Sequence, residues 1–226
     1  MTILWRPMRP HDVHECVEIV AAHPIQAPRY GAAIYDLKTV WQGLLGREAI
    51  RAVVLEEAQH DSKATKVGVG VSVFISDDFL QYIKTPPFFW VYPELIKRIV
   101  SGKSPLLSDK QTRDANANGG LNLFVWEGAL RGDYENRAEK LTSVLSAFLE
   151  QHRGFRLKEL ISHGNSIERV RGMLRTGSQF LNEDGKYVDQ LRKPLHEVFQ
   201  LPHYVGLTRE AAMSRLGSWV GVLFLT

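Results

Sequence analysis

The chain has 226 residues, of which 44% are hydrophobic, 23% are charged and 10% are aromatic. These proportions are typical of globular proteins and exclude disordered, collagen-like and coiled-coil chains. The length fits one domain, or one domain enlarged by an insertion. A single cysteine, Cys16, excludes a disulfide framework within the chain and any zinc or iron–sulfur site that needs several cysteines.

The charge balance argues against a nucleic-acid partner. The net charge is only +3, from 28 basic and 25 acidic residues, whereas a nucleic-acid binder normally carries a stronger basic excess. Basic residues outnumber acidic ones mainly in residues 131–175, which fits either an anion site or an ordinary solvated helix surface. No apolar run approaches the ~20 residues of a membrane span, and the first ten residues lack a secretory core. We therefore expect a cytoplasmic protein without a membrane partner.

The first third of the chain predicts two helices and three strands. Pro7 ends the first strand because proline donates no ladder hydrogen bond. Asp12 and Glu15 have the spacing of a capping box, which predicts the start of the first helix. The expected elements are a strand at 3–7, a helix after Asp12, a helix at 34–45, and strands at 50–55 and 67–75 joined by a polar, turn-like linker at 56–66.

Residues 76–120 interrupt this regular pattern. They contain an aromatic cluster, a predicted helix at 92–100 and a polar run at 109–120. The segment is too long for an ordinary connection, so we interpret it as an insertion within a single domain that spans residues 1–226. Its aromatic side chains either pack the insertion onto the main core or form a substrate pocket or lid.

The next segment predicts two parallel strands. The apolar run 121–126 is followed by a loop with Gly128, Arg131 and Gly132, a helix, and a strand at 157–162. A strand–helix–strand unit of this kind places its strands in parallel with a right-handed crossover. A helix after Asn165, strands at 178–181 and 219–225, and a loop at 191–215 with a short helix near Thr208 complete the prediction. The apolar last strand must be paired in its own sheet or by another subunit, which would give a homodimer.

This order of elements resembles the GNAT superfamily of acyl-CoA-dependent N-acyltransferases. The segments that carry the resemblance are WRPMRPHDV (5–13), LNLFVWEGALRGDYENRAEKL (121–141), and Asn165 with the helix that runs to Gly177. The resemblance implies an α/β (α+β) fold: a mixed, mostly antiparallel twisted sheet with a central parallel strand pair, flanked by helices and enlarged by the inserted segment.

The resemblance also implies a coenzyme A site where the two parallel strands splay, with acetyl-CoA or another acyl-CoA as co-substrate. The N–H groups that open the loop at residues 131–137, and the following helix, would receive its diphosphate, since a helix N-terminus attracts anions. Tyr134 and Asn136 stand where the family has glycine-type residues, and two acidic residues lie beside them, so a simple capped helix start is the competing interpretation. The expected cofactor-binding residues are Val125, Arg131, Gly132, Asn136, Arg137 and Asn165.

In this family the acyl group passes directly from the thioester to a bound amine, which requires a base and an acid. Glu127, expected at the end of the central strand, is the candidate base, and burial beside Trp126 would raise its pKa. The usual tyrosine acid is absent from the helix after Asn165, so Tyr134 or Tyr187 would replace it. The acceptor would be a small-molecule or peptide amine. His11 and His14 lie one helical turn apart without an obvious third ligand, so we expect no metal site. The alternative function is a catalytically inactive GNAT-like domain that senses a ligand or binds a protein.

Overall fold

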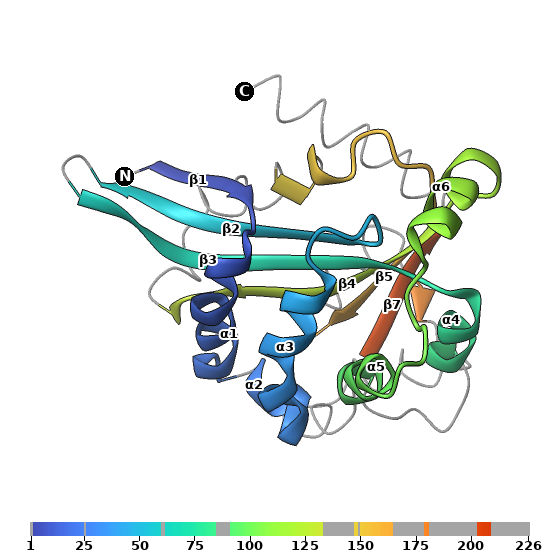
Figure 1. Cartoon of the computed structure of the whole chain (residues 1–226), viewed down its shortest axis with the longest axis horizontal. Coiled ribbons are helices and arrows are strands. Elements are labelled where there is room, and N and C mark those ends of the chain that lie inside the picture. The colour runs from blue at the N-terminus through green and yellow to red at the C-terminus, as the bar shows by residue number, and fades with distance from the viewer. Residues whose placement is uncertain are drawn as a thin grey trace.

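The computed structural model describes residues 2–24, 26–59, 62–84, 91–132, 147–148, 150–164, 179–180 and 203–208. These residues form a seven-stranded sheet in the order β1-β2-β3-β4-β5-β7-β6 (Figure 1). The strands are β1 (Thr2–Pro7), β2 (Ile50–Gln59), β3 (Ser62–Ile75), β4 (Leu121–Leu130), β5 (Leu157–Gly164), β6 (Gln179–Phe180) and β7 (His203–Thr208). The pair β4–β5 is parallel and the other neighbours are antiparallel. The predicted fold class, a mixed and mostly antiparallel sheet around a parallel pair, is confirmed.

The linker expected at 56–66 is wrong, because β2 and β3 continue through it as one long hairpin. Pairing runs from Ile50↔Val73 to Gln59↔Ser62, with register shifts near its outer end. The polar side chains do not end these strands, because charged side chains of neighbouring elements form ion pairs with them. Lys66 forms an ion pair with Glu15 at 2.7 Å. A polar stretch can therefore remain in a sheet when its charges are paired.

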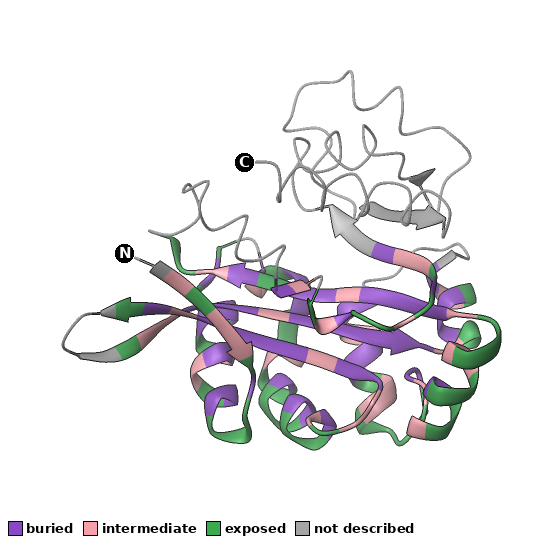
Figure 2. Ribbon diagram, turned by 90° about the horizontal axis from the view of Figure 1, so that it is seen from above, coloured by how far each residue is buried: buried purple, intermediate pink, exposed green. Residues whose placement is uncertain are grey.

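Five helices cover one face of the sheet (Figure 1). They are α1 (Val13–Ala22), α2 (Ala27–Tyr30), α3 (Ile34–Leu44), α4 (Asp77–Lys84) and α5 (Val91–Val100). Each longer helix turns its apolar side to the core, as Leu37, Val40, Trp41 and Leu44 do in α3. Figure 2 shows the same pattern, with buried residues along the sheet and on one side of each helix.

Helix α6 (Asp109–Asn118) was expected only as a polar run. In α6 only Thr112 is buried, so no apolar periodicity marks this helix. The helix begins with a capping box, in which Ser108 Oγ accepts from the backbone N–H of Gln111 and the Gln111 side chain accepts from the Ser108 N–H. Capping, rather than amphipathicity, is thus the local signal for this element.

The capping role expected for Asp12 is wrong. Its carboxylate makes no capping bond to α1 and instead accepts two hydrogen bonds from the Arg6 guanidinium, at 2.6 and 2.9 Å. The same guanidinium binds Glu56 of β2 at 2.6 Å. The hydrogen bonds from Arg6 hold the pKa of the Asp12 carboxyl well below its ordinary value. The Arg6–Asp12 ion pair joins β1 to the start of α1.

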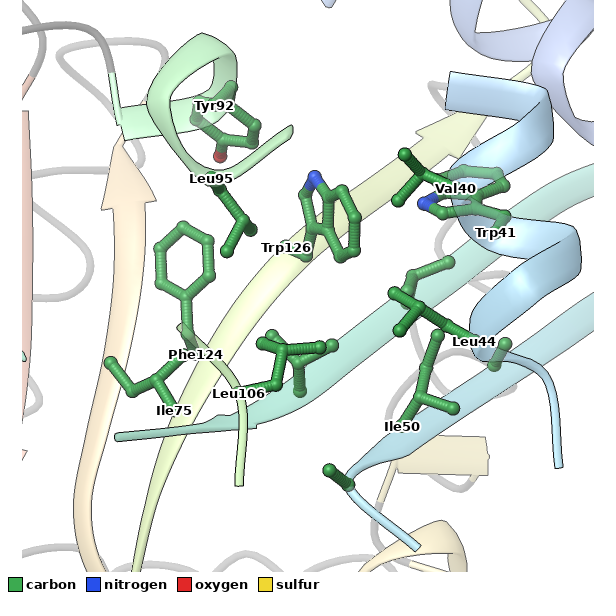
Figure 3. Close-up of a cluster of buried hydrophobic side chains, with 14 of the residues drawn as sticks. Val40, Trp41, Leu44, Ile50, Ile75, Tyr92, Leu95, Leu106, Phe124 and Trp126 are labelled. Carbon is green, nitrogen blue, oxygen red and sulfur yellow. The ribbon is translucent and has the colours of Figure 1, made fainter. Parts of the chain in front are cut away.

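Aromatic side chains join the helices to the central strand (Figure 3). Trp126 of β4 meets Trp41 of α3 edge to face, with ring centroids 6.1 Å apart. Phe124, two residues earlier, contacts Tyr92 of α5 at 5.9 Å. Phe79 of α4 is also buried in this core. The described aromatic side chains of residues 76–120 therefore pack onto the core, and one of them, Tyr82, also lines a cavity beside α5. Phe88, Phe89 and Trp90 lie outside the described residues.

The opposite face of the sheet is contacted by the segment that precedes β5. There the buried His152 Nε2 lies 2.8 Å from Ser72 Oγ of β3, and its Nδ1 lies 2.7 Å from the Phe148 carbonyl oxygen. Burial lowers the pKa of His152 to about 4. The Arg51 guanidinium lies over the Phe155 ring nearby, at 4.5 Å.

The last part of the chain differs from the prediction in one element. Residues 203–208, expected as part of a loop, form β7, which pairs antiparallel with β5. The short helix expected to begin near Thr208 falls on residues after β7, which lie outside the described part of the chain. The strand expected at 178–181 is present as β6, and the strand expected at 219–225 lies outside the described residues. Among the helices that the structure describes, none has the length and apolarity needed to cross a membrane.

Candidate functional site

The two parallel strands part midway along β4. Their pairing runs from Leu121↔Leu157 to Phe124↔Ile161 and then ends. Beyond that point β5 pairs only with β7, whereas β4 continues to Leu130 beside β3. Figure 3 shows the two ribbons separating beyond Phe124. In the described part of the chain, no strand pairs with this edge of β4 from Val125 onward.

A β-bulge in β4 sets the direction of Glu127. Val71 of β3 is opposite Glu127 and the next residue, Ser72, is opposite Val125, so Trp126 is an extra residue in the ladder. Trp126 packs against Trp41 of α3, and Glu127 bonds to Tyr30 of α2, so both side chains face the helix layer. Strict alternation would have placed Glu127 on the opposite face.

Glu127 is a buried carboxyl group, only 2% exposed, inside β4 and not at the strand end as expected. Its Oε2 accepts a hydrogen bond of 2.6 Å from the Tyr30 hydroxyl, and its Oε1 accepts one of 2.9 Å from the Gly128 N–H. Burial raises the pKa of Glu127, and the nearby charge of Arg29 and these hydrogen bonds lower it by a smaller amount. The pKa therefore changes in the direction expected from the sequence.

Three residues in and before α2 form a network that reaches this part of β4, and sequence reasoning missed all of them. Tyr30 donates to Glu127, and burial raises the pKa of Tyr30 well above its ordinary value. The Arg29 guanidinium lies 4.6 Å from the centre of the Tyr92 ring and donates to Gln26 Oε1. Gln26 Nε2 in turn donates to the Gly128 carbonyl oxygen at 3.2 Å. The segment follows Pro24 and contains Pro28, and it shows no apolar periodicity. No local signal could therefore have linked Tyr30 to Glu127, 97 residues away.

Arg131 is placed differently from the expected diphosphate ligand. Its backbone N–H donates to the Val67 carbonyl oxygen at 2.9 Å, so this N–H belongs to the sheet and is not free to bind a phosphate. Its side chain, 44% exposed, forms an ion pair of 3.3 Å with Glu15 of α1. Gly132 follows on the exposed surface. The other expected residues, Tyr134, Asn136, Arg137, Asn165 and Tyr187, lie outside the described residues, so their roles remain predictions.

Two cavities lie in this part of the described structure, and only the smaller has a β4 residue in its lining. The larger, of about 810 Å³, lies between α2 and α5 and has Arg29 and Tyr30 among its lining residues. The smaller, of about 330 Å³, is lined by Asp77, Asn122 and Lys158 at the other end of β4 from Glu127. In the ranges that the structure describes, no group of three or more histidine, cysteine or acidic side chains could hold a metal ion. A buried carboxyl with raised pKa is a type of group that can transfer protons, and Glu127 lies beside the parting of the two strands but lines neither of these cavities.

Comparison with known proteins gives a match in structure but not in sequence. No protein-family model matches the chain, and neither does any curated protein sequence. A candidate arylalkylamine N-acetyltransferase 7 from the yellow fever mosquito is similar over 92% of this chain and 87% of its own, with a TM-score of 0.51 and 15% identity. A spermidine/spermine N-acetyltransferase from Vibrio cholerae aligns over 95% of this chain and 96% of its own, with a TM-score of 0.48 and 10% identity. The likeness to the mosquito protein concerns the fold alone. The chain has the fold of the GNAT superfamily, as its sequence predicted.

Proposed function

We propose that this protein transfers an acyl group from an acyl-CoA, with acetyl-CoA as the first donor to test, directly to an amine. The observation that carries the proposal is Glu127, a buried carboxyl with raised pKa on the helix side of β4, just beyond the end of the β4–β5 pairing. A carboxylate of raised pKa is a stronger base than an exposed one, and it can take a proton from an ammonium group near neutral pH.

The free edge of β4 fits the extended, amide-containing arm of coenzyme A. From Val125 onward the described strand has no paired strand on the β5 side. The Gly128 N–H and C=O already bond to Glu127 and Gln26, so the backbone groups of the other residues at this edge are the ones proposed to receive an extended ligand. The Arg131 side chain would contact the diphosphate if it left Glu15, and an exposed ion pair of this kind is weak. Gly132, Asn136, Arg137 and Asn165 remain the proposed further ligands. Bound acyl-CoA would supply the activated thioester carbonyl.

The chain's own residues would then move the protons of the transfer. Glu127 takes a proton from the ammonium of the acceptor, which frees the nitrogen lone pair to attack the thioester carbon. The new C–N bond forms as the C–S bond breaks, and the departing thiolate takes a proton, for which Tyr134 is the proposed donor. The acceptor is a small-molecule or peptide amine, and the proposed location of the enzyme is the cytoplasm.

One observation favours a second function, that of a non-catalytic ligand-binding or protein-binding domain. Both oxygens of Glu127 already have donors within the protein, and Tyr30, which covers it, is fully buried. A satisfied buried polar network also stabilises a fold without taking part in chemistry. In that case, replacement of Glu127 would lower stability, and no amine would be acylated.

Thermal unfolding with and without acetyl-CoA tests the proposed cofactor. A ligand at 100 times its Kd stabilises the folded state by about 2.7 kcal/mol, which gives a measurable rise in Tm. Arg131→Ala should weaken this binding, and Arg153→Ala, which removes an exposed arginine paired with Glu150, is the matched control. If saturating acetyl-CoA gives neither a Tm shift nor a heat of binding, acetyl-CoA is excluded as the donor.

Thiol release from acetyl-CoA in the presence of a panel of amines tests the reaction. Glu127→Gln keeps the shape of the side chain but removes the base, so kcat should fall at least tenfold while acetyl-CoA binding is unchanged. An unchanged kcat would remove Glu127 from the mechanism. Binding of acetyl-CoA without acylation of any amine would favour the non-catalytic function.

A further inference from the structure

We propose that Tyr30 is a positioning residue for Glu127, and that Gln26 and Arg29 hold the α2 segment so that the Tyr30 hydroxyl fixes the carboxylate. The inference rests on the proposed function, in which Glu127 is the base. It assigns a role to a segment that has no other evident reason to carry three buried polar side chains.

Two hydrogen bonds link the α2 segment to the bulge of β4, and a third, within β4, completes the arrangement. The Tyr30 hydroxyl donates to Glu127 Oε2 at 2.6 Å, and the Gly128 N–H donates to Glu127 Oε1 at 2.9 Å. Gln26 Nε2 donates to the carbonyl oxygen of the same Gly128 at 3.2 Å. Because each carboxylate oxygen has its own donor, the carboxylate cannot rotate without breaking a buried hydrogen bond. The orientation of Glu127 therefore depends on where α2 lies.

Arg29 adds a buried positive charge to this arrangement. Its side chain is nearly inaccessible to water, and its Nε has no hydrogen-bond partner among the described residues. Its guanidinium lies over Tyr92 of α5 and donates to Gln26. Its charge is the largest of the effects that lower the pKa of Glu127, followed by the Tyr30 hydroxyl, the Gly128 N–H and a small contribution from His23. These groups oppose the larger effect of burial.

The groups that lower the pKa of Glu127 matter because a buried carboxyl group can act as a base only if it is ionised. Burial alone would favour the neutral form of Glu127, which cannot accept a proton. Arg29 and Tyr30 stabilise the ionised form, and the net pKa stays above the ordinary value. Tyr30 is itself held in place, because its ring meets Tyr92 edge to face at 5.3 Å. Tyr30→Phe therefore removes one hydroxyl group and keeps the ring packing.

The experiment compares Tyr30→Phe with Tyr82→Phe in the intact chain. Tyr82 stacks on Phe79 of α4, and it supplies a matched loss of one tyrosine hydroxyl outside the Glu127 network. In Tyr30→Phe the acid limb of the pH–rate profile should move to higher pH, because Glu127 loses a hydrogen bond that stabilises its charge. The kcat at neutral pH should fall several-fold while the Kd of acetyl-CoA stays the same. Tyr82→Phe should leave the pH profile unchanged.

A fall in Tm without movement of the pH profile would show that Tyr30 is only a packing residue, and it would overturn the proposal. A second measurement does not depend on activity. An NMR titration of carboxyl-labelled glutamate, with the Glu127 signal assigned through Glu127→Gln, should give a higher pKa for Glu127 in Tyr30→Phe than in the unmodified protein. An equal pKa in the two proteins overturns the positioning role. A raised pKa in a protein that acylates no amine supports the positioning role and counts against the proposed function alone.

Discussion

His152 makes the stability of this protein dependent on pH. Its Nδ1 faces the carbonyl oxygen of Phe148, which can only accept, so Nδ1 carries the proton and Nε2 accepts from Ser72. Burial, with the charge of Arg51, favours this neutral form and lowers the pKa of His152 to about 4 from an ordinary 6.5. Protonation in the folded state would therefore place an unfavourable charge beneath the sheet.

The size of the effect follows from the two pKa values. Because the pKa is lowered in the folded state, the stability contributed by neutral His152 is fully present above pH 6.5 and is lost as the pH falls toward 4. At pH 5 the unfolded chain binds a proton here and the folded chain does not, which costs about 2 kcal/mol relative to pH 8. The full loss, below pH 4, is about 3 kcal/mol.

Urea unfolding at pH 8 and pH 5 measures this loss, and the comparison with His152→Gln isolates it. Glutamine can accept a hydrogen bond from Ser72 but does not titrate. Between pH 8 and pH 5 the free energy of unfolding of the variant should therefore fall by about 2 kcal/mol less than that of the unmodified protein. The difference between the two proteins removes the effects of other titrating groups, Glu127 included. Equal losses in the two proteins would refute the reasoning, as would an NMR titration in which His152 becomes charged near pH 6.5.

Two further predictions concern single side chains, and both are checked by urea unfolding. Gly120 has φ +89°, and a Cβ there would lie 3.1 Å from a backbone carbonyl oxygen just before β5. Gly120→Ala should therefore lower the free energy of unfolding by about 1 kcal/mol or more. Gly119→Ala, whose Cβ would have no atom within 4 Å, should change it little. An equal effect of the two substitutions would contradict this geometry. Trp126→Ala should lower the free energy of unfolding by about 3–5 kcal/mol, because it opens a cavity against Trp41. Tyr35→Ala, at a side chain that is 86% exposed, should change the free energy of unfolding by no more than about 0.5 kcal/mol. A small loss in Trp126→Ala would show that the core around β4 can collapse.

The sheet could be predicted from the sequence where its strands are apolar. The run that begins at Leu121 is buried on both faces, and composition alone marks such a strand. The outer half of the hairpin could not be predicted in the same way. There Glu56 and Lys66 stay in the ladder because Arg6 and Glu15 supply opposite charges from other elements, and pairing across such distances leaves no local pattern.

The candidate site could be predicted only in part, because its carboxylate lies on the chain's clearest strand but its partners do not. Glu127 stood out as the acidic residue that follows an apolar run. The α2 segment that contacts it has only four helical residues, too few for periodicity, and it owes its place to contacts with β4 and α5. The side-chain direction of Glu127 also depends on the ladder with β3, which the sequence of β4 does not contain.

The additional residue at Trp126 divides β4 into two halves of opposite phase. Before Trp126, side chains at even-numbered positions such as Phe124 face the helix layer. After it, side chains at odd-numbered positions such as Ala129 face that layer. Loss of a single codon here would leave the composition of the strand almost unchanged and yet exchange its two surfaces from that point on. The spacing between Phe124 and Glu127 should therefore be more sensitive to insertion or deletion than the identity of the residues between them.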